Sequence, residues 1–78
     1  MPAAVDHEQV LDGRRALNRM MALIHQLDPL DRQVMLLYLE GLDAASIGDI
    51  TGISAGNVAT KVHRLKKVLA QRLQRGTP

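Results

Sequence analysis

Residues 43–73 read DAASIGDITGISAGNVATKVHRLKKVLAQRL and carry the signals of a short helix, a three-residue turn and a longer helix. Asp43 is suited to cap the first of these helices. Gly52 predicts where that helix ends, because glycine adopts the left-handed conformation of a helix C-terminus without steric cost. Ser54 follows as the expected N-cap of the second helix.

The second helix of this stretch is expected to have one apolar and one cationic face. Hydrophobic residues recur at spacings of three and four and therefore lie on one stripe of the helix. They are Val58, Val62, Leu65, Leu69 and Leu73. The opposite face carries Thr60, His63, Arg64, Lys67 and Gln71. Lys61 and Lys66 lie on the flanks of that face.

The two helices must approach each other closely. Gly48 supplies a small residue for the crossing, and Ile47 and Ile50 are expected on the apolar side of the short helix. The pair then forms a helix-turn-helix, which presents a helix N-terminus and a basic face to the major groove of DNA. On spacing alone, an ordinary helical hairpin with a solvated basic face remains the alternative, because motifs of this length give false positives.

The composition is that of one small domain, with 78 residues, a net charge of +2 and no cysteine. The chain has neither the apolar run of a membrane span nor the basic start of a signal peptide. We therefore expect a soluble, cytoplasmic protein with no membrane partner. All eight acidic residues lie at or before Asp49, and the cationic segment after it has the charge pattern of a phosphate-binding surface.

Tyr38 is the only aromatic residue of the chain. Proteins that bind single strands or read RNA stack bases on aromatic side chains, so this class of function is excluded. Duplex binding has no such requirement.

The chain before residue 43 predicts two further helices. The first is expected from Asp6 to Leu27, with an apolar stripe formed by Val10, Leu17, Met20, Met21, Ile24 and Leu27. The second begins at residues 28–31, DPLD, where Asp28 can act as cap, Pro29 fits the first helical position and Asp31 complements the helix dipole.

The inward side of this second helix is expected to hold Leu30, Val34, Leu37 and Met35, and Gly41 to close it. The predicted fold is therefore all-α, a compact four-helix domain over residues 6–75 with a C-terminal helix-turn-helix and a long recognition helix. Residues 1–5 are expected to form a disordered N-terminus.

The chain carries no arrangement typical of catalysis. His7, His25 and His63 are too scattered for a metal site, and no histidine base neighbours Ser46 or Ser54 in sequence. A phosphate-cradling glycine loop is also missing from the sequence. We therefore predict no enzyme activity and no cofactor or metal.

Residues 27–69, LDPLDRQVMLLYLEGLDAASIGDITGISAGNVATKVHRLKKVL, resemble region 4 of bacterial RNA polymerase sigma factors, especially the extracytoplasmic-function (ECF) group. Ahead of the helix-turn-helix the matching residues are Leu27, Pro29, Arg32, Tyr38 and Gly41. Within and after it they are Gly52, Ile53, Ser54, Gly56, Asn57, Val58, Arg64, Lys66 and Lys67.

The resemblance implies that the last helix binds the −35 element of promoter DNA and that the first helices dock on the β-subunit flap of core RNA polymerase. Carried over by position, the residues near base edges would be Asn57, Ala59, Thr60, Lys61 and His63. The residues serving phosphates or guanines would be Arg64, Lys66 and Lys67. Ser54 belongs to the same expected DNA-binding set. An anti-sigma factor is a further expected partner, and a monomer is expected, with a dimer left open by the Met and Leu residues of the first helix.

The chain departs from the family pattern in two places. Ser46 and Gly48 stand where the family usually has Glu and Ala, and Ala59 and Lys61 stand where Lys or Arg, and Arg, are common. The promoter-melting region of a whole sigma factor is not in this sequence, so an excised domain or a small stand-alone relative is expected.

Two other functions remain open at this point. One is the output domain of a LuxR-type regulator, although the start of the second helix and Tyr38-x-Glu40-Gly41 favour a sigma factor. The other is a sigma-like adaptor that holds polymerase or an anti-sigma factor and barely touches DNA, which the residues at positions 59 and 61 keep open.

Overall fold

The computed structural model describes residues 7–75, with side chains from residue 13 onward. This part of the chain contains four helices and no strand: α1 (His7–His25), α2 (Pro29–Leu39), α3 (Ala44–Thr51) and α4 (Ala55–Arg75). The prediction of an all-α four-helix domain ending in a helix-turn-helix is confirmed. The expected disordered segment, residues 1–5, lies outside the described residues.

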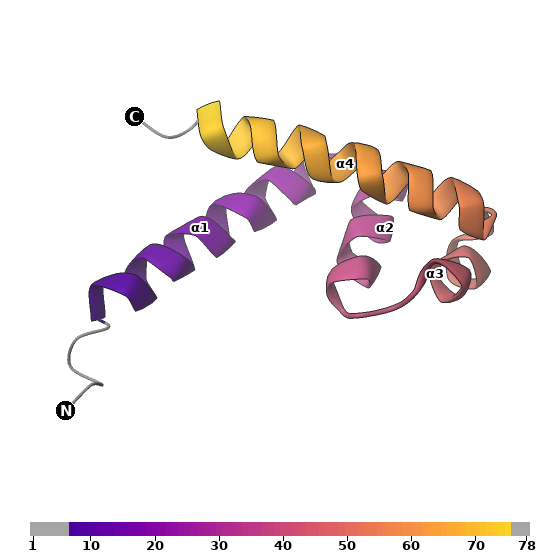
Figure 1. Ribbon diagram of the computed structural model, residues 1–78, viewed down its shortest axis with the longest axis horizontal. Coiled ribbons are helices and arrows are strands. Elements are labelled where there is room, and N and C mark those ends of the chain that lie inside the picture. The colour runs from indigo at the N-terminus through magenta and orange to yellow at the C-terminus, as the bar shows by residue number, and fades with distance from the viewer. Residues whose placement is uncertain (1–6, 76–78) are drawn as a thin grey trace.

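Helix α4 is the longest helix and contacts each of the other three (Figure 1). Its N-terminal half lies over α2 and α3, and its C-terminal half meets α1. Two hydrophobic clusters result, one formed by Ile24, Met35, Leu65 and Leu69 and the other by Val34, Ile47, Val58 and Val62. Tyr38 packs against both clusters and joins them. The apolar stripe predicted for α4 is thus the element around which the other three helices pack.

The helix ends form where the local signals predict them. The Asp43 carboxylate accepts a hydrogen bond from the Ser46 backbone N–H at 2.8 Å, at the start of α3. Gly52 ends α3 with φ of 84°, in the left-handed region. The Asn57 backbone N–H then donates to Ser54 Oγ at 3.1 Å, which caps the start of α4.

Gly48 is buried where α3 meets the turn. A Cβ built on it would lie 2.5 Å from the backbone oxygen of Ile53, closer than such atoms are found in proteins. A small residue was predicted at this position, and it is the backbone of the turn leading into α4 that leaves no space for a side chain. This close approach sets how tightly the two helices of the motif fold together.

Two predictions for α1 are wrong in detail. The helix ends at His25 rather than Leu27, because the Gln26 and Leu27 N–H groups donate to carbonyls three residues back, which tightens the last turn. Leu17 was expected inside but is 53% exposed, because α1 diverges from α4 toward its N-terminus (Figure 1). Val10 lies outside the described side chains.

The buried faces of α2 and α3 are rotated from the predicted ones. Leu30 is 38% exposed and Ile50 is 54% exposed, although both were expected inside. The buried side of α3 points between Ile47 and Gly48, and with 3.6 residues per turn Ile50 falls on the far side of Ile47. In α2 Val34 and Met35 are buried as expected, and a buried side centred between them turns Leu30 outward for the same reason.

Asp28 is wrong as a side-chain cap. Its side chain makes no capping hydrogen bond, and only its backbone carbonyl takes part in the first turn of α2, by accepting from the Arg32 N–H at 2.8 Å. Pro29 at the first helical position leaves one donor fewer to satisfy there.

The Asp43 cap predicts a dependence of stability on pH. The backbone N–H of Ser46 first, and then its hydroxyl, lower the pKa of the Asp43 carboxyl below its ordinary value. The resulting stabilisation is present above the unfolded-state pKa of about 4 and is lost as the pH falls through the lower folded-state pKa. Asp43→Asn keeps a capping oxygen but cannot titrate. We expect the difference in Tm between the two proteins to be constant above roughly pH 5 and to change below about pH 4; a difference that stays constant down to pH 2 would contradict the assignment.

Candidate nucleic-acid interface

The outward face of α4 is exposed from its first turn onward. Solvent-exposed positions include Asn57, Thr60, His63, Arg64 and Lys67. From residue 55 to residue 75 the sequence has six Lys or Arg residues, Lys61, Arg64, Lys66, Lys67, Arg72 and Arg75, and no Asp or Glu. The start of the helix, where unpaired N–H groups and the positive end of the dipole favour anions, is also at the surface. Charge and helix polarity thus favour the same kind of ligand, a polyanion.

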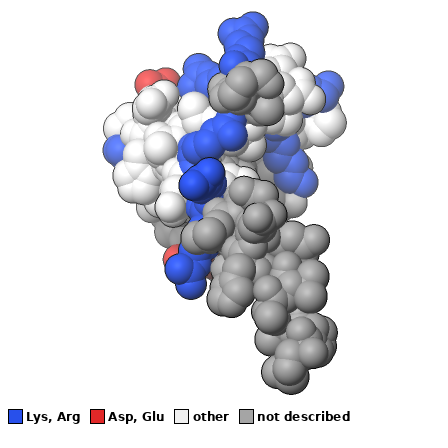
Figure 2. All heavy atoms as spheres, turned by 90° about the vertical axis from the view of Figure 1, so that its left-hand side faces the viewer, with Lys and Arg blue, Asp and Glu red and all other residues white. Residues whose placement is uncertain are grey.

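The cationic surface continues beyond the N-terminal half of α4. Figure 2 views the molecule from the end at which α1 and the C-terminal half of α4 lie, and Lys and Arg side chains form a band across it. Among the residues drawn in colour, Asp and Glu show only at the margins of this view. The exposed arginines of α1 and the end of α4 are Arg14, Arg15, Arg19, Arg72 and Arg75.

Arg19 ties the two ends of this surface together. Its guanidinium donates to the backbone oxygen of Leu73 at 2.7 Å, near the end of α4. A cation bound to the last carbonyls of a helix is favourably placed with respect to its dipole. Arg19 therefore has a structural role as well as a charge.

One flank of α4 borders a shallow groove of about 320 Å³. Its lining residues are Leu30, Ile53, Asn57, Thr60, Lys61 and Arg64. Amide, hydroxyl and guanidinium groups are those that hydrogen-bond to base edges in the major groove. Three side chains with that capacity are therefore gathered on adjacent turns of one helix, at the edge of the exposed face.

Lys61, in the same groove, already has a partner. Its ammonium lies 2.6 Å from the Asp31 carboxylate in the first turn of α2, and the two side chains are only 19% and 18% exposed. The sequence placed Lys61 on the flank of the DNA-binding face but gave no sign of this pair. The two residues are 30 positions apart, and only the packing of α2 on α4 brings them together.

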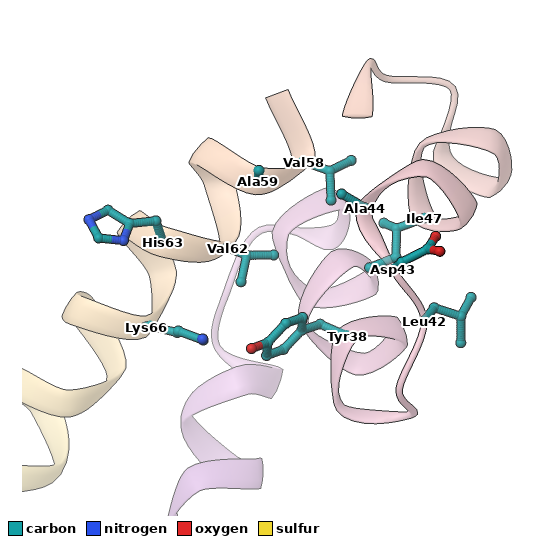
Figure 3. A pocket seen from close by; sticks show the side chains of 10 residues that line it. All are labelled: Tyr38, Leu42, Asp43, Ala44, Ile47, Val58, Ala59, Val62, His63 and Lys66. Atoms are coloured by element: carbon teal, nitrogen blue, oxygen red, sulfur yellow. The ribbon is translucent and has the colours of Figure 1, made fainter. Parts of the chain in front are cut away.

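The other flank of α4 borders an apolar groove of about 260 Å³ (Figure 3). Lys66 extends toward Tyr38, with its ammonium 4.7 Å from the centre of the ring. Such a cation–π contact is worth about 0.5–1 kcal/mol at an exposed site. His63 points away from Tyr38, and Ala59 brings only a methyl group to the rim.

The nine predicted residues therefore fall into separate groups in space. Five point outward on α4: Asn57, Thr60, His63, Arg64 and Lys67. Ser54 is occupied as a cap, Lys61 with Asp31 and Lys66 with Tyr38. Ala59 lies at the surface without a polar group. Eight of the nine predicted residues thus lie on α4, and the sequence did not indicate which of its cations are already engaged.

Within the described residues, no group of three or more His, Cys, Asp or Glu side chains is placed to hold a metal ion. Among the helices over that same range, none is both long and apolar enough to span a membrane.

Helices α1, α2 and α3 support the cationic helix α4, and a short turn that begins at Gly52 joins α3 to α4. This arrangement is that of a helix-turn-helix DNA-binding domain. A family model described as "Sigma-70, region 4" matches residues 17–69, which is more than half of the chain. The chain belongs to the sigma-70 region 4 family, as its resemblance predicted. The family is a non-catalytic DNA-binding domain of sigma factors and implies interaction with DNA and RNA polymerase in transcription. No curated protein and no solved structure matched the chain.

Proposed function

We propose that this chain is the promoter-recognition domain of an ECF-type sigma factor, which reads the −35 element through α4 and docks on core RNA polymerase. The observation that carries the proposal is the outward face of α4, which is exposed, cationic and free of carboxylates from its capped start onward. Presented by a helix-turn-helix, such a face fits the major groove of duplex DNA.

The proposed contacts divide by chemistry. Asn57, Thr60 and His63 lie toward the start of α4 and are proposed to meet base edges, with Ala59 offering a methyl surface. Those proposed for phosphates or guanines are Arg64, Lys66 and Lys67. Ser54 caps the first turn of α4, which is proposed to lie at the DNA surface. Lys61 can contact DNA only when its ion pair with Asp31 opens.

Docking on the polymerase is proposed for the platform formed by α1 and α2. Leu17, on α1, is 53% exposed and supplies apolar surface outside the helix-turn-helix. We propose the β-subunit flap as the partner of this platform. An anti-sigma factor that covers the same surface would block the interaction.

The proposal is tested by a pull-down of core RNA polymerase from a bacterial lysate, followed by selection of bound duplexes from a random pool. We expect the polymerase to be recovered together with an enriched upstream promoter motif. A palindromic motif without polymerase would instead indicate that the domain binds DNA as a dimer and without polymerase, as LuxR-type output domains do. That result would overturn the proposed function.

A sigma-like adaptor with little DNA binding is the second candidate. It is favoured by a specific observation, namely that Lys61 and Lys66 are both engaged within the protein and that Ala59 has no polar group. The two functions differ in salt dependence, because neutralising phosphates makes duplex affinity fall steeply as salt rises. A weak affinity for duplex DNA that does not vary between 50 and 200 mM salt would support the adaptor.

A further inference from the structure

We propose that Asp31 is an internal competitor of DNA for Lys61: its carboxylate occupies the lysine ammonium as a phosphate would, and thereby lowers the affinity of α4 for duplexes of any sequence. This inference rests on the proposed function, since it requires that α4 bind duplex DNA. It assigns a role in discrimination to a residue of α2 that lies outside the proposed DNA-binding set.

The position of the pair carries the inference. Lys61 lines the same groove as Asn57, Thr60 and Arg64, all of which are proposed to face DNA. Its ammonium, 2.6 Å from the Asp31 carboxylate, therefore lies at the edge of the proposed interface. The charge is within reach of the interface but is neutralised before DNA arrives.

The pair is also able to open. A side chain that is 19% exposed still reaches water, and the four-carbon stem of lysine lets the ammonium swing from one anion to another. Exchange of a carboxylate for a phosphate keeps the number of ionic contacts of Lys61 constant. The exchange leaves Asp31 without its cation near a polyanion, however, and this unpaired carboxylate opposes binding.

The expected consequence is a selective one. A phosphate contact by Lys61 would be independent of base sequence and would strengthen binding to all duplexes alike. Withholding it lowers the non-specific background and leaves the proposed contacts of Asn57, Thr60 and His63 with base edges in place. Discrimination then depends more on base contacts than on total charge.

The test is Asp31→Asn, which keeps the shape of the side chain and removes its charge. We expect several-fold tighter binding to the selected promoter duplex and to a scrambled duplex at 50 mM salt. The plot of log affinity against log salt should steepen by about 0.9, the value for one additional phosphate contact. The ratio of the two affinities should stay the same or fall.

Two further variants attribute the effect to Lys61. Lys61→Gln alone should leave the salt slope within about 0.3 of the wild type, well under one phosphate contact, because Lys61 makes no such contact in the wild type. Its affinity for both duplexes should fall, because Asp31 is left unpaired near the polyanion. Asp31→Asn/Lys61→Gln should return the gain to the wild-type value. Glu40→Gln is the matched control, since it removes one carboxylate from the opposite end of α2 and should reproduce only a minor part of the gain.

The outcomes separate this inference from the proposed function. If wild type binds duplexes with a clear salt slope and Asp31→Asn does not steepen it, or the double variant keeps the gain, the inference fails and the proposed function stands. If Asp31→Asn does not fold, Lys61→Gln decides, because a slope reduced by about 0.9 would show that Lys61 reaches DNA despite Asp31. If wild type shows no salt-dependent duplex binding, both fail together.

Discussion

Gly48→Ala is expected to lower the free energy of unfolding by about 2 kcal/mol, and Gly48→Val by more, because either side chain overfills a site that has no space. The first atom beyond Cα would already lie 2.5 Å from the Ile53 carbonyl oxygen and 3.5 Å from the Ala55 nitrogen. Both are backbone atoms, so no rotamer change can relieve the clash. The turn must move, and with it the start of α4.

Thermal or urea unfolding followed by circular dichroism measures this effect. Gly13→Ala is the matched control, because Gly13 also lies within a helix but nothing stands within 4 Å of its added Cβ. That control should be neutral or stabilising by up to about 1 kcal/mol, the helix preference of alanine over glycine. A Gly48→Ala protein as stable as Gly13→Ala would show that the turn and α3 do not approach as closely as described.

The motif that organises the fold could be predicted because its signals are local. Asp43, Gly52 and Ser54 each act within three or four residues of themselves, through a capping hydrogen bond or a left-handed backbone conformation. The stripe on α4 could be predicted as well, since Val58 and Leu69 repeat at the helical period over several turns.

The remaining features depend on how the helices pack against one another, and local sequence patterns do not predict this packing. Periodicity shows that a helix has an apolar side, but in a short helix it does not show where the centre of that side lies. Leu30 and Ile50 were therefore predicted to be buried, although both are exposed. The partners of Lys61 and Lys66 are set by where Asp31 and Tyr38 arrive on α4. The outward face itself was predictable, because it is simply the side of α4 left over by the stripe.

Arg64→Ala is expected to weaken duplex binding far more than Arg14→Ala. Arg64 is exposed on α4 and lines the groove shared with Asn57 and Thr60, whereas Arg14 lies on α1, outside the helix-turn-helix. If Arg64 reads a guanine, its loss should cost about 1–3 kcal/mol, or roughly 5- to 150-fold in affinity, for the selected duplex alone. If it holds a phosphate, all duplexes should lose affinity and the salt slope should fall by about 0.9.

Titration of both variants against a selected and a scrambled duplex, at several salt concentrations, distinguishes these two roles. Arg14→Ala is the matched control, because it removes the same charge from the same protein and accounts for the change in overall electrostatic attraction. We expect that control to stay within about twofold of wild type at 150 mM salt, where the screening length is near 8 Å. Equal losses of affinity for Arg64→Ala and Arg14→Ala would mean that the cationic surface acts through its total charge. The outward face of α4 could then no longer be regarded as the surface that reads the promoter.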